Sequence, residues 1–410
     1  MSRAPPQPAY ILRGHGSAVQ ATLFMRQNSR LATGDAEGWV VIWDLAIKRP
    51  TTVWKAHDGS LLGIGDWAQD KIITHGKDNK LVVWRLRDED EETMSKILPL
   101  ETPADPRKLP WCLYVLNVNT MNFCSFAHVE MPATASSEIL IAVPHILTSE
   151  TIDIFHLPST ARMHTIPASP AFKGGMIMAL SIFYHPKTGR LNVIAGFESG
   201  HTRVWELINA AWQALYSAHP HSQPVLSLAI SSNRHSYVTS SADALIACHT
   251  IPGSGSEIRT QGGDREAGEA SACKLINTRH AGQQGLQTRN DGKIFATAGW
   301  DGRVRVYAYQ TLRELAVLKW HQKGCYTLAF ADILMDSSPA SIHKFDAHGT
   351  SIAASLPSDP NVVEQVPREN QVMQNSSAVR ARQERIWKAH HTHWIAVGGK
   401  DGQVSLWDIY

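Results

Sequence analysis

The stretch GGKDGQVSLWDIY, residues 398–410, joins a tight polar turn to a short β-branched strand that carries a tryptophan. Five other segments share this layout, with a polar turn residue six positions before an aromatic residue or histidine. The pairs are Glu37/Trp43, Asp78/Trp84, Ser199/Trp205, Asp243/His249, Asp301/Tyr307 and Asp401/Trp407. A seventh segment, 148–157, keeps the offset with Ser149 and Phe155 but lacks the glycine. A fixed offset in so many segments indicates an internal repeat, and the repeat decides the fold.

A second element of the repeat, a small residue followed by histidine, lies upstream of the turns. Its clearest examples are Gly14-His15, Ala56-His57 and Ala218-His219, with Arg279-His280 and Trp320-His321 weaker. His57 precedes Trp84 by 27 residues, and His280 precedes Tyr307 by the same distance. Gly-His and Trp-Asp at this separation are typical of the WD repeat, in which about 40–45 residues form one four-stranded propeller blade.

The polar residues of the repeat predict hydrogen-bond networks inside the blades. The turn aspartate can accept from the histidine ring, a threonine can take the other ring nitrogen, and the aromatic residue completes the chain. Buried polar groups are normally partnered in this way. The predicted networks are His57, Thr74, Asp78 and Trp84; His280, Thr297, Asp301 and Tyr307; and His321, Asp401 and Trp407.

The two ends of the repeat array predict how the ring closes. The last repeat provides three strands, whereas the segment AYILR, residues 9–13, precedes the first Gly-His and belongs to no blade of its own. We expect 9–13 to pair with 403–407, since pairing removes an exposed sheet edge. The pairing residues would be Tyr10, Ile11, Leu12, Val404 and Leu406. The fold class predicted is therefore all-β, a closed seven-bladed propeller.

Departures from the regular spacing predict the domain organisation. Residues 9–410 form a single propeller, preceded by a disordered segment, 1–8. The charged, Pro-rich stretch 87–110 is expected to be a loop, and 252–272 a flexible linker. A long insertion in the last blade, 332–391, is expected to be largely unpacked with a short helix at Ser377–Lys388.

Composition and motifs exclude several function classes. The formal net charge is +2, too small for a broad phosphate-binding surface, so direct nucleic-acid binding is not expected. No apolar run is long enough to span a membrane. The five cysteines form no Cys-x-x-Cys pair, which favours reduced thiols and an intracellular protein. Enzyme and dinucleotide signatures are missing, so we expect neither a catalytic site nor a cofactor.

Several stretches are candidate sites, each with a plainer structural interpretation. An acidic run and a basic stretch are candidate partner contacts, although either could be ordinary solvated surface. Their residues are Asp88, Glu89, Asp90, Glu91 and Glu92, and Arg380, Arg382, Arg385 and Trp387. The histidines of KAHHTHW, 388–394, suggest a metal, but a loop entering a strand explains them better. Tryptophans could form a methyl-lysine cage, yet Trp43, Trp84, Trp205 and Trp407 already have a place in the repeat.

Taken together, ILRGHGSAVQATLF (11–24), TGDAEGWVVIWDL (33–45), HGKDNKLVVWRL (75–86) and VGGKDGQVSLWDIY (397–410) resemble the fungal WD-repeat subunit of the ASTRA complex. The likeness extends over nearly the whole chain, including the degenerate third repeat and the insertion in the last. It implies a non-catalytic chromatin-remodelling scaffold in the nucleus, with the cytoplasm as a second location. Implied partners are RuvB-like ATPases and the co-chaperones that mature phosphatidylinositol-3-kinase-related kinases. The alternative is another WD adaptor, such as a histone-binding protein or a ubiquitin-ligase substrate receptor.

Overall fold

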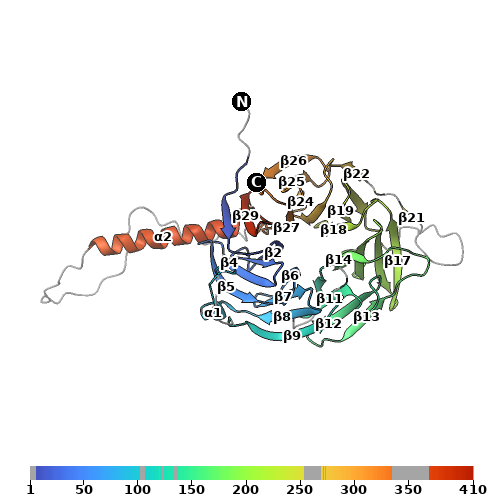
Figure 1. Cartoon of the computed structure of the whole chain (residues 1–410), viewed down its shortest axis with the longest axis horizontal. Coiled ribbons are helices and arrows are strands. Elements are labelled where there is room, and N and C mark those ends of the chain that lie inside the picture. Colours follow the sequence, from blue (N-terminus) through green and yellow to red (C-terminus); the bar gives the residue numbers. More distant parts are fainter. Residues whose placement is uncertain are drawn as a thin grey trace, which may run out of the picture.

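Seven sheets, each built on four antiparallel strands, stand radially around a central channel in the computed structural model of the chain (Figure 1). The structure describes residues 6–101, 107–119, 121, 123–132, 137–253, 269–270, 272, 274–334 and 369–409. Of 269–270 and 369–378 it describes only the backbone. The all-β, seven-bladed propeller predicted from the repeat is confirmed.

Each blade has four strands that follow one another in space from the channel outward. Blade 1 contains β2 (Val19–Met25), β3 (Arg30–Asp35), β4 (Trp39–Asp44) and β5 (Arg49–Lys55). Blade 2 contains β6 (Leu61–Trp67), β7 (Lys71–Gly76), β8 (Lys80–Arg85) and β9 (Trp111–Asn117). Blade 3 contains β10 (Ala127–Glu130), β11 (Ile139–Pro144), β12 (Ile152–Leu157) and β13 (Arg162–Ile166).

The remaining blades repeat this order with local additions. Blade 4 contains β14 (Ile177–Tyr184), β15 (Leu191–Phe197), β16 (Thr202–Ile208), β17 (Ala211–Ala218) and an added strand, β21 (Glu269–Ala270). Blade 5 contains β18 (Val225–Ile230), β19 (Ser236–Ser241), β20 (Leu245–Thr250) and β22 (Lys274–Asn277). Blade 6 contains β23 (Gln283–Thr288), β24 (Ile294–Gly299), β25 (Arg303–Ala308) and β26 (Glu314–Lys319). Blade 7 contains β27 (Cys325–Phe330), β28 (Trp394–Gly399), β29 (Gln403–Asp408) and, as its outer strand, β1 (Tyr10–Arg13).

The ring closes in blade 7, where the first strand pairs with the last. β1 runs antiparallel to β29 in a register that places Tyr10 opposite Leu406 and Leu12 opposite Val404. Leu12 is 2% exposed and belongs to a core shared by blades 7 and 1. Closure by the N-terminal strand, including its predicted contacts, is therefore confirmed.

The cores lie between neighbouring blades, because each sheet packs on both faces. Val40, Val41 and Ile42 are successive residues of β4, and all three are fully buried. A strand buried on both faces needs an uninterrupted apolar run rather than an alternating one, and β-branched residues suit it. This explains the repeated WVVIW-like strands.

The insertion 87–110 crosses from blade 2 onto blade 1. Its described residues, 87–101 and 107–110, contain one short helix, α1 (Asp88–Glu91), and are otherwise irregular. The Val53 amide of outer strand β5 donates to the Ser95 carbonyl, 2.8 Å away, and the Leu100 amide donates to the Gly14 carbonyl. Met94 is buried in the core between blades 1 and 2. The predicted loop therefore packs on the ring and covers part of an edge strand.

The other two insertions also contain ordered elements. β21, part of the predicted linker 252–272, pairs in parallel with β17 of blade 4. Within 332–391 the helix α2 spans Glu369–His391, which is longer than the predicted Ser377–Lys388, and it projects away from the ring (Figure 1). The predictions of disorder at 1–5, flexibility at 254–268 and an unpacked 335–368 lie outside the described residues. Neither α1 nor the described part of α2 has the length and hydropathy that a membrane crossing needs.

Candidate functional site

The His-Asp networks occupy the interior of the blades. In blade 2, His57 Nδ1 lies 2.9 Å from Asp78 Oδ1, and His57 Nε2 lies 2.8 Å from Thr74 Oγ1. The Trp84 indole donates to the same Thr74 hydroxyl over 2.8 Å. Burial lowers the pKa of His57, which keeps the ring neutral and suited to bridging two side chains. The four residues predicted for this blade thus form one chain of hydrogen bonds.

Blade 7 has the same network with a different hydroxyl. His321 Nδ1 lies 3.1 Å from Asp401 Oδ2, and His321 Nε2 lies 2.9 Å from Ser405 Oγ. The Trp407 indole also donates to Ser405, over 2.9 Å. Burial opposes ionisation of Asp401, but the His321 hydrogen bond and the other local interactions outweigh it and lower the pKa of Asp401. The sequence analysis missed Ser405, because it sits on the third strand of the blade whereas Thr74 sits on the second.

In blade 6 the predicted His280 network is wrong. His280 Nδ1 is 3.7 Å from Asp301 Oδ2, beyond hydrogen-bond range, and its side chain is 40% exposed. Asp301 instead accepts from the buried Arg305 guanidinium at 2.6 Å. The Thr297 hydroxyl donates to Gln283 Oε1 at 2.6 Å, so the fully buried Gln283 takes the place of histidine. A buried guanidinium needs a carboxylate partner, and Arg305 therefore forms an ion pair with the turn aspartate, Asp301.

Blades 1 and 5 contain networks that the sequence analysis did not assign. His15 lies 2.7 Å from both Asp35 and Thr33, so the turn acid of the first repeat is Asp35 rather than Glu37. In blade 5 the histidine is His221, 3.2 Å from Asp243 and 2.9 Å from Thr239, rather than His219. In SAHPHS, residues 217–222, the Ala-His pair is followed after one proline by a second histidine, and that second histidine was the available signal.

The aromatic position of the repeat is structural in the blades where it was predicted. Trp205 is 8% exposed and packs on Phe197, with 6.2 Å between ring centroids. Tyr307 is 2% exposed and stacks on Phe295 at 4.9 Å. The most exposed tryptophans of the described residues belong to separate elements, β9, the β24–β25 turn and α2. These are Trp111, Trp300 and Trp387. They do not converge into a methyl-lysine cage.

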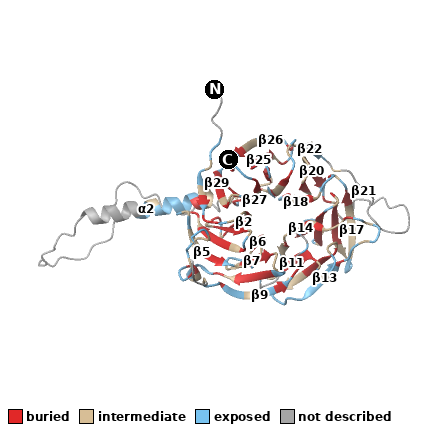
Figure 2. Cartoon of the chain, viewed as in Figure 1, coloured by how far each residue is buried: buried red, intermediate tan, exposed pale blue. Residues whose placement is uncertain are grey.

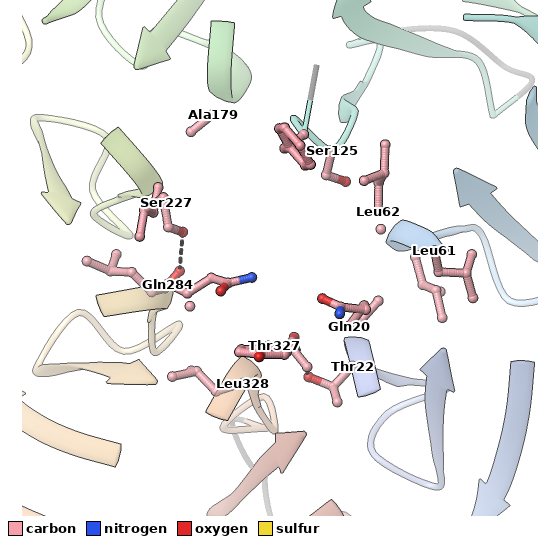
Figure 3. Close-up of a pocket in the computed structure, with 18 of the residues that line it drawn as sticks. Gln20, Thr22, Leu61, Leu62, Ser125, Ala179, Ser227, Gln284, Thr327 and Leu328 are labelled. Carbon is pink, nitrogen blue, oxygen red and sulfur yellow. Dashed lines mark hydrogen bonds between the residues drawn. The ribbon is translucent and has the colours of Figure 1, made fainter. Parts of the chain in front are cut away.

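The central channel encloses about 750 Å³ and is lined by the inner strands of the blades. Figure 3 shows Gln20, Ser125 and Gln284 around the open centre, and the polar side chains of the lining are hydroxyls, amides and the Lys77 ammonium. Thr22 and Thr327 share a hydrogen bond of 3.1 Å between adjacent inner strands. Among the described residues that line the channel, none is Asp, Glu, His or Cys.

Three carboxylates of the acidic run Asp88–Glu92 accept hydrogen bonds from groups of this chain. Arg26 donates to Asp88 at 2.5 Å and also to Glu91, and Arg30 donates to Glu91 at 3.0 Å. Glu91 is 4% exposed. The Asp90 carboxylate accepts from the Arg87 amide at the start of α1. Three members of the run are exposed, and one of them, Asp88, is already paired with Arg26. The exposed carboxylates left for a partner are therefore Glu89 and Glu92.

The basic stretch, in contrast, is on the surface. It forms the C-terminal half of α2, where residues 379, 380 and 382–388 are exposed (Figure 2). Its predicted contact residues are all among them. They are Arg380, Arg382, Arg385 and Trp387. These side chains are available to a partner, although the structure contains none.

The histidine cluster at the end of α2 has structural partners. His390 Nδ1 lies 2.5 Å from the Gln27 carbonyl, and His391 Nδ1 lies 2.9 Å from the Trp387 carbonyl. No set of three or more metal-ligating side chains occurs in the described part of the chain. The expected loop is shorter than predicted, because His390 and His391 are the last residues of α2 and only Thr392 and His393 connect the helix to β28.

Asn28 is a site residue that the sequence analysis missed. Its amide nitrogen donates to the Asp332 carbonyl at 2.8 Å and to the His390 carbonyl at 3.0 Å, and its amide oxygen accepts from the Asp332 amide at 2.9 Å. One buried side chain in the β2–β3 turn thus holds both ends of the insertion. The φ of Asn28 is 64°, a left-handed conformation that asparagine tolerates better than most residues.

Comparison with known proteins places the chain in a family. A family model described as ASTRA-associated protein 1 matches residues 8–407. The protein of that name from Verticillium alfalfae is 45% identical over 99% of this chain and 93% of its own length. Those from Penicillium rubens and Schizosaccharomyces pombe are 43% and 32% identical, covering 100% and 79% of this chain and 98% and 93% of theirs. This seven-bladed propeller therefore belongs to the ASTRA-associated protein 1 family.

Proposed function

We propose that the chain is a non-catalytic scaffold subunit of the ASTRA complex. The family match over residues 8–407 carries this proposal, because the relatives are named for association with that complex. A closed ring is suited to the role, since it presents loops and outer edges to several proteins from one rigid body. Such a subunit acts through its surface rather than through bond-making groups.

The chemistry of the interior supports a scaffold over an enzyme. The titratable side chains at the repeat positions are committed to hydrogen bonds within the blades, as for His57 and His321. The channel lining is neutral apart from Lys77 at pH 7. Ser405, His321 and Asp401 lie in the order of a Ser-His-Asp triad, with His321 Nε2 2.9 Å from Ser405 Oγ, but Ser405 is 0% exposed, so no substrate can reach its hydroxyl.

We place the protein in the nucleus and assign it two linked roles, in chromatin remodelling and in maturation of phosphatidylinositol-3-kinase-related kinases. Its partners in this proposal are RuvB-like ATPases and kinase-maturation co-chaperones. The basis is the resemblance of the four motif stretches to the fungal WD-repeat subunit of ASTRA. Nucleic acid is not a proposed partner, given the formal net charge of +2.

Affinity purification of the tagged, full-length chain at native expression level tests the role. We expect quantitative mass spectrometry to recover RuvB-like ATPases and kinase-maturation subunits at constant ratios to the bait. Removing the chain should lower the steady-state level of the kinases, and the wild-type gene should restore it. Recovery of a cullin scaffold or of histones in their place would instead support another adaptor function and refute the proposal.

A further inference from the structure

The exposed half of α2 and the neighbouring β4–β5 turn form a positively charged surface beside the closure of the ring. We call this surface the basic arm, and define it by Arg380, Arg382, Arg385, Trp387, Lys388 and Lys48. The helix projects from the junction of blades 7 and 1 (Figure 1). Along this half of the helix, residues 379, 380 and 382–388 are exposed. Because these positions follow one another along the helix, with only Ala381 half-buried among them, this stretch presents most of its sides to a partner.

The arm is held at its root rather than loosely attached. Ala389, one residue beyond Lys388, is 2% exposed and lies in the core shared by blades 7 and 1. The carbonyl of His390 accepts from Asn28, and its ring contacts the Gln27 carbonyl. The rigid ring therefore orients the first turns of the arm, and a partner would meet a preorganised surface.

The helical part of the basic arm carries more positive charge than negative charge. From Val379 to His391 there are four Arg and Lys residues and one acid. That acid, Glu384, pairs with Lys388 at 2.9 Å. Arg382 and Arg385 form no ion pair with any carboxylate among the described residues.

Lys48 adds a further cation at the base of the arm. Burial lowers the pKa of Lys48, and the nearby charges of Arg385 and Lys388 lower it further, whereas Asp44 partly offsets them. The ammonium lies 5.6 Å from the ring centroid of Tyr10 and 5.9 Å from that of Trp394. Like charges gathered at one place favour the approach of an anionic ligand.

Apolar side chains lie among these charges. Trp387 is 60% exposed and stacks on His391, with 4.7 Å between ring centroids, and Ile386 is 41% exposed. Tryptophan and arginine are the residues most often found at the energetic centre of protein interfaces. A nucleic acid would need a continuous basic stripe, whereas here an acid and two apolar residues interrupt the cations.

We propose that the basic arm binds an acidic peptide segment of a partner protein, one that also carries an apolar residue to cover Trp387. Carboxylates of the segment would pair with Arg382 and Arg385, whose planar guanidinium groups can each donate two parallel hydrogen bonds to a carboxylate. The existence of such a partner in the cell rests on the scaffold function proposed above. The chemistry of the surface does not, and it can be measured on the purified chain.

The first experiment measures binding to a defined probe. A fluorescein-labelled peptide of 14 residues, rich in Glu with Leu and Phe interspersed, is titrated with the full-length protein and followed by fluorescence anisotropy. We expect Arg382→Glu/Arg385→Glu to weaken binding at least tenfold and Trp387→Ala about fivefold, with affinity falling as salt rises. Lys173→Glu/Lys187→Glu, an equal charge change at exposed sites on blade 4, is the matched control and should stay within twofold.

The same titration contains the outcomes that would overturn the proposal. Equal weakening by the control pair would show that only net charge matters. Tighter binding of a 20-base-pair DNA duplex than of the peptide would identify a nucleic-acid surface instead. Absence of peptide binding by wild-type protein at low salt would remove the proposal altogether. Circular dichroism of each variant separates these results from misfolding.

A second experiment locates the contact in the assembled complex. A photo-crosslinking amino acid replaces Trp387 in the full chain, the complex is purified, and the crosslinked peptides are sequenced. We expect the crosslinks to fall in an acidic segment of one partner subunit. Crosslinks to neutral or basic segments, or to this chain itself, would refute the proposal that the basic arm binds an acidic segment. So would the absence of crosslinks from position 387 when the same photo-crosslinking amino acid at position 173 forms them. A purification that yields no ASTRA proteins would count against the proposed function. The peptide titration would then still decide whether the basic arm binds an acidic segment.

Discussion

Removal of the Asn28 side chain is the sharpest test of how the insertion is held. Asn28 is 2% exposed and makes three hydrogen bonds, two to Asp332 and one to the carbonyl of His390, with lengths between 2.8 and 3.0 Å. A buried hydrogen bond contributes about 1 kcal/mol, so Asn28→Ala should cost about 3 kcal/mol from these contacts. A further 1 kcal/mol or so comes from placing alanine at a φ of 64°.

Two further variants separate the causes. Asn28→Gly removes the same hydrogen bonds without the strain at positive φ, but gives the unfolded chain more freedom, so it should lie within about 1 kcal/mol of Asn28→Ala. Asn290→Ala is the matched control. Asn290 makes the same type of paired contact, to the amide and carbonyl of Ile333, but it is exposed, so water can replace it at a cost below about 1 kcal/mol.

Hydrogen exchange measured by mass spectrometry is the assay, with urea unfolding beside it. The loss should appear first as local opening, because Asn28 ties the two ends of an insertion rather than two blades. For about 3 kcal/mol we expect exchange at residues 389–391 and 331–333 to rise roughly a hundredfold, while β11 and β15 stay protected. Near-wild-type protection in Asn28→Gly would refute the reasoning, since it would assign the effect to backbone strain alone.

Three further predictions concern the ring. Leu12→Asp puts an unpaired charge into the closure core and should lower stability on the order of 3–5 kcal/mol; an unchanged urea midpoint would argue against closure by β1. His57→Ala should cost about 1–3 kcal/mol, whereas His219→Ala, outside the network, should cost less than about 0.5 kcal/mol; equal costs would disprove the network's contribution. Burial lowers the pKa of His75 and His249 to about 3, so only the unfolded chain takes up these protons between pH 6.5 and 3. Stability should therefore be complete above pH 6.5 and fall by roughly 1.4 kcal/mol per pH unit for each ring on acidification, and His75→Leu should flatten this slope in urea titrations.

The fold could be predicted because a repeat states the same physical requirement many times. A turn residue six positions before an aromatic recurred even in the third blade, where Ser149 and Phe155 keep the offset without the glycine. Closure followed from counting strands, because β1 had no other blade to join. Spacing is preserved across blades by the geometry of the four-stranded sheet, so it survives the loss of any single residue type.

The individual networks were less predictable, because several residue types can satisfy the same buried atoms. Gln283 replaces histidine in blade 6, and Ser405 reaches its histidine from a different strand than Thr74 does. Arg305 was invisible as a competitor for Asp301, because its burial depends on packing between blades. A local pattern reveals which residue could bond, but not which of two neighbours the folded chain brings within reach.

The insertions were the least predictable parts, since they obey no repeat. The acidic run appeared free for a partner, yet Arg26 and Arg30 of the preceding blade bind Glu91. Their contact spans about 60 positions along the chain, and nothing in the run itself indicates it. The basic half of α2 differs, because Arg382 and Arg385 form no ion pair with a carboxylate among the described residues.

The pairing of β1 with β29 also affects the kinetics of folding. Arg13 and Gln403, which hydrogen-bond across this pair, are 390 positions apart. On the ribosome, β1 must therefore wait for nearly the entire chain before its partner β29 is made, and long-range pairing of this kind is slow. During that interval the unpaired β1 is complementary to the open edge of β29 in any other copy whose ring has not closed. Crowded expression should then favour strand-exchanged dimers, which dilution before the final folding step would suppress.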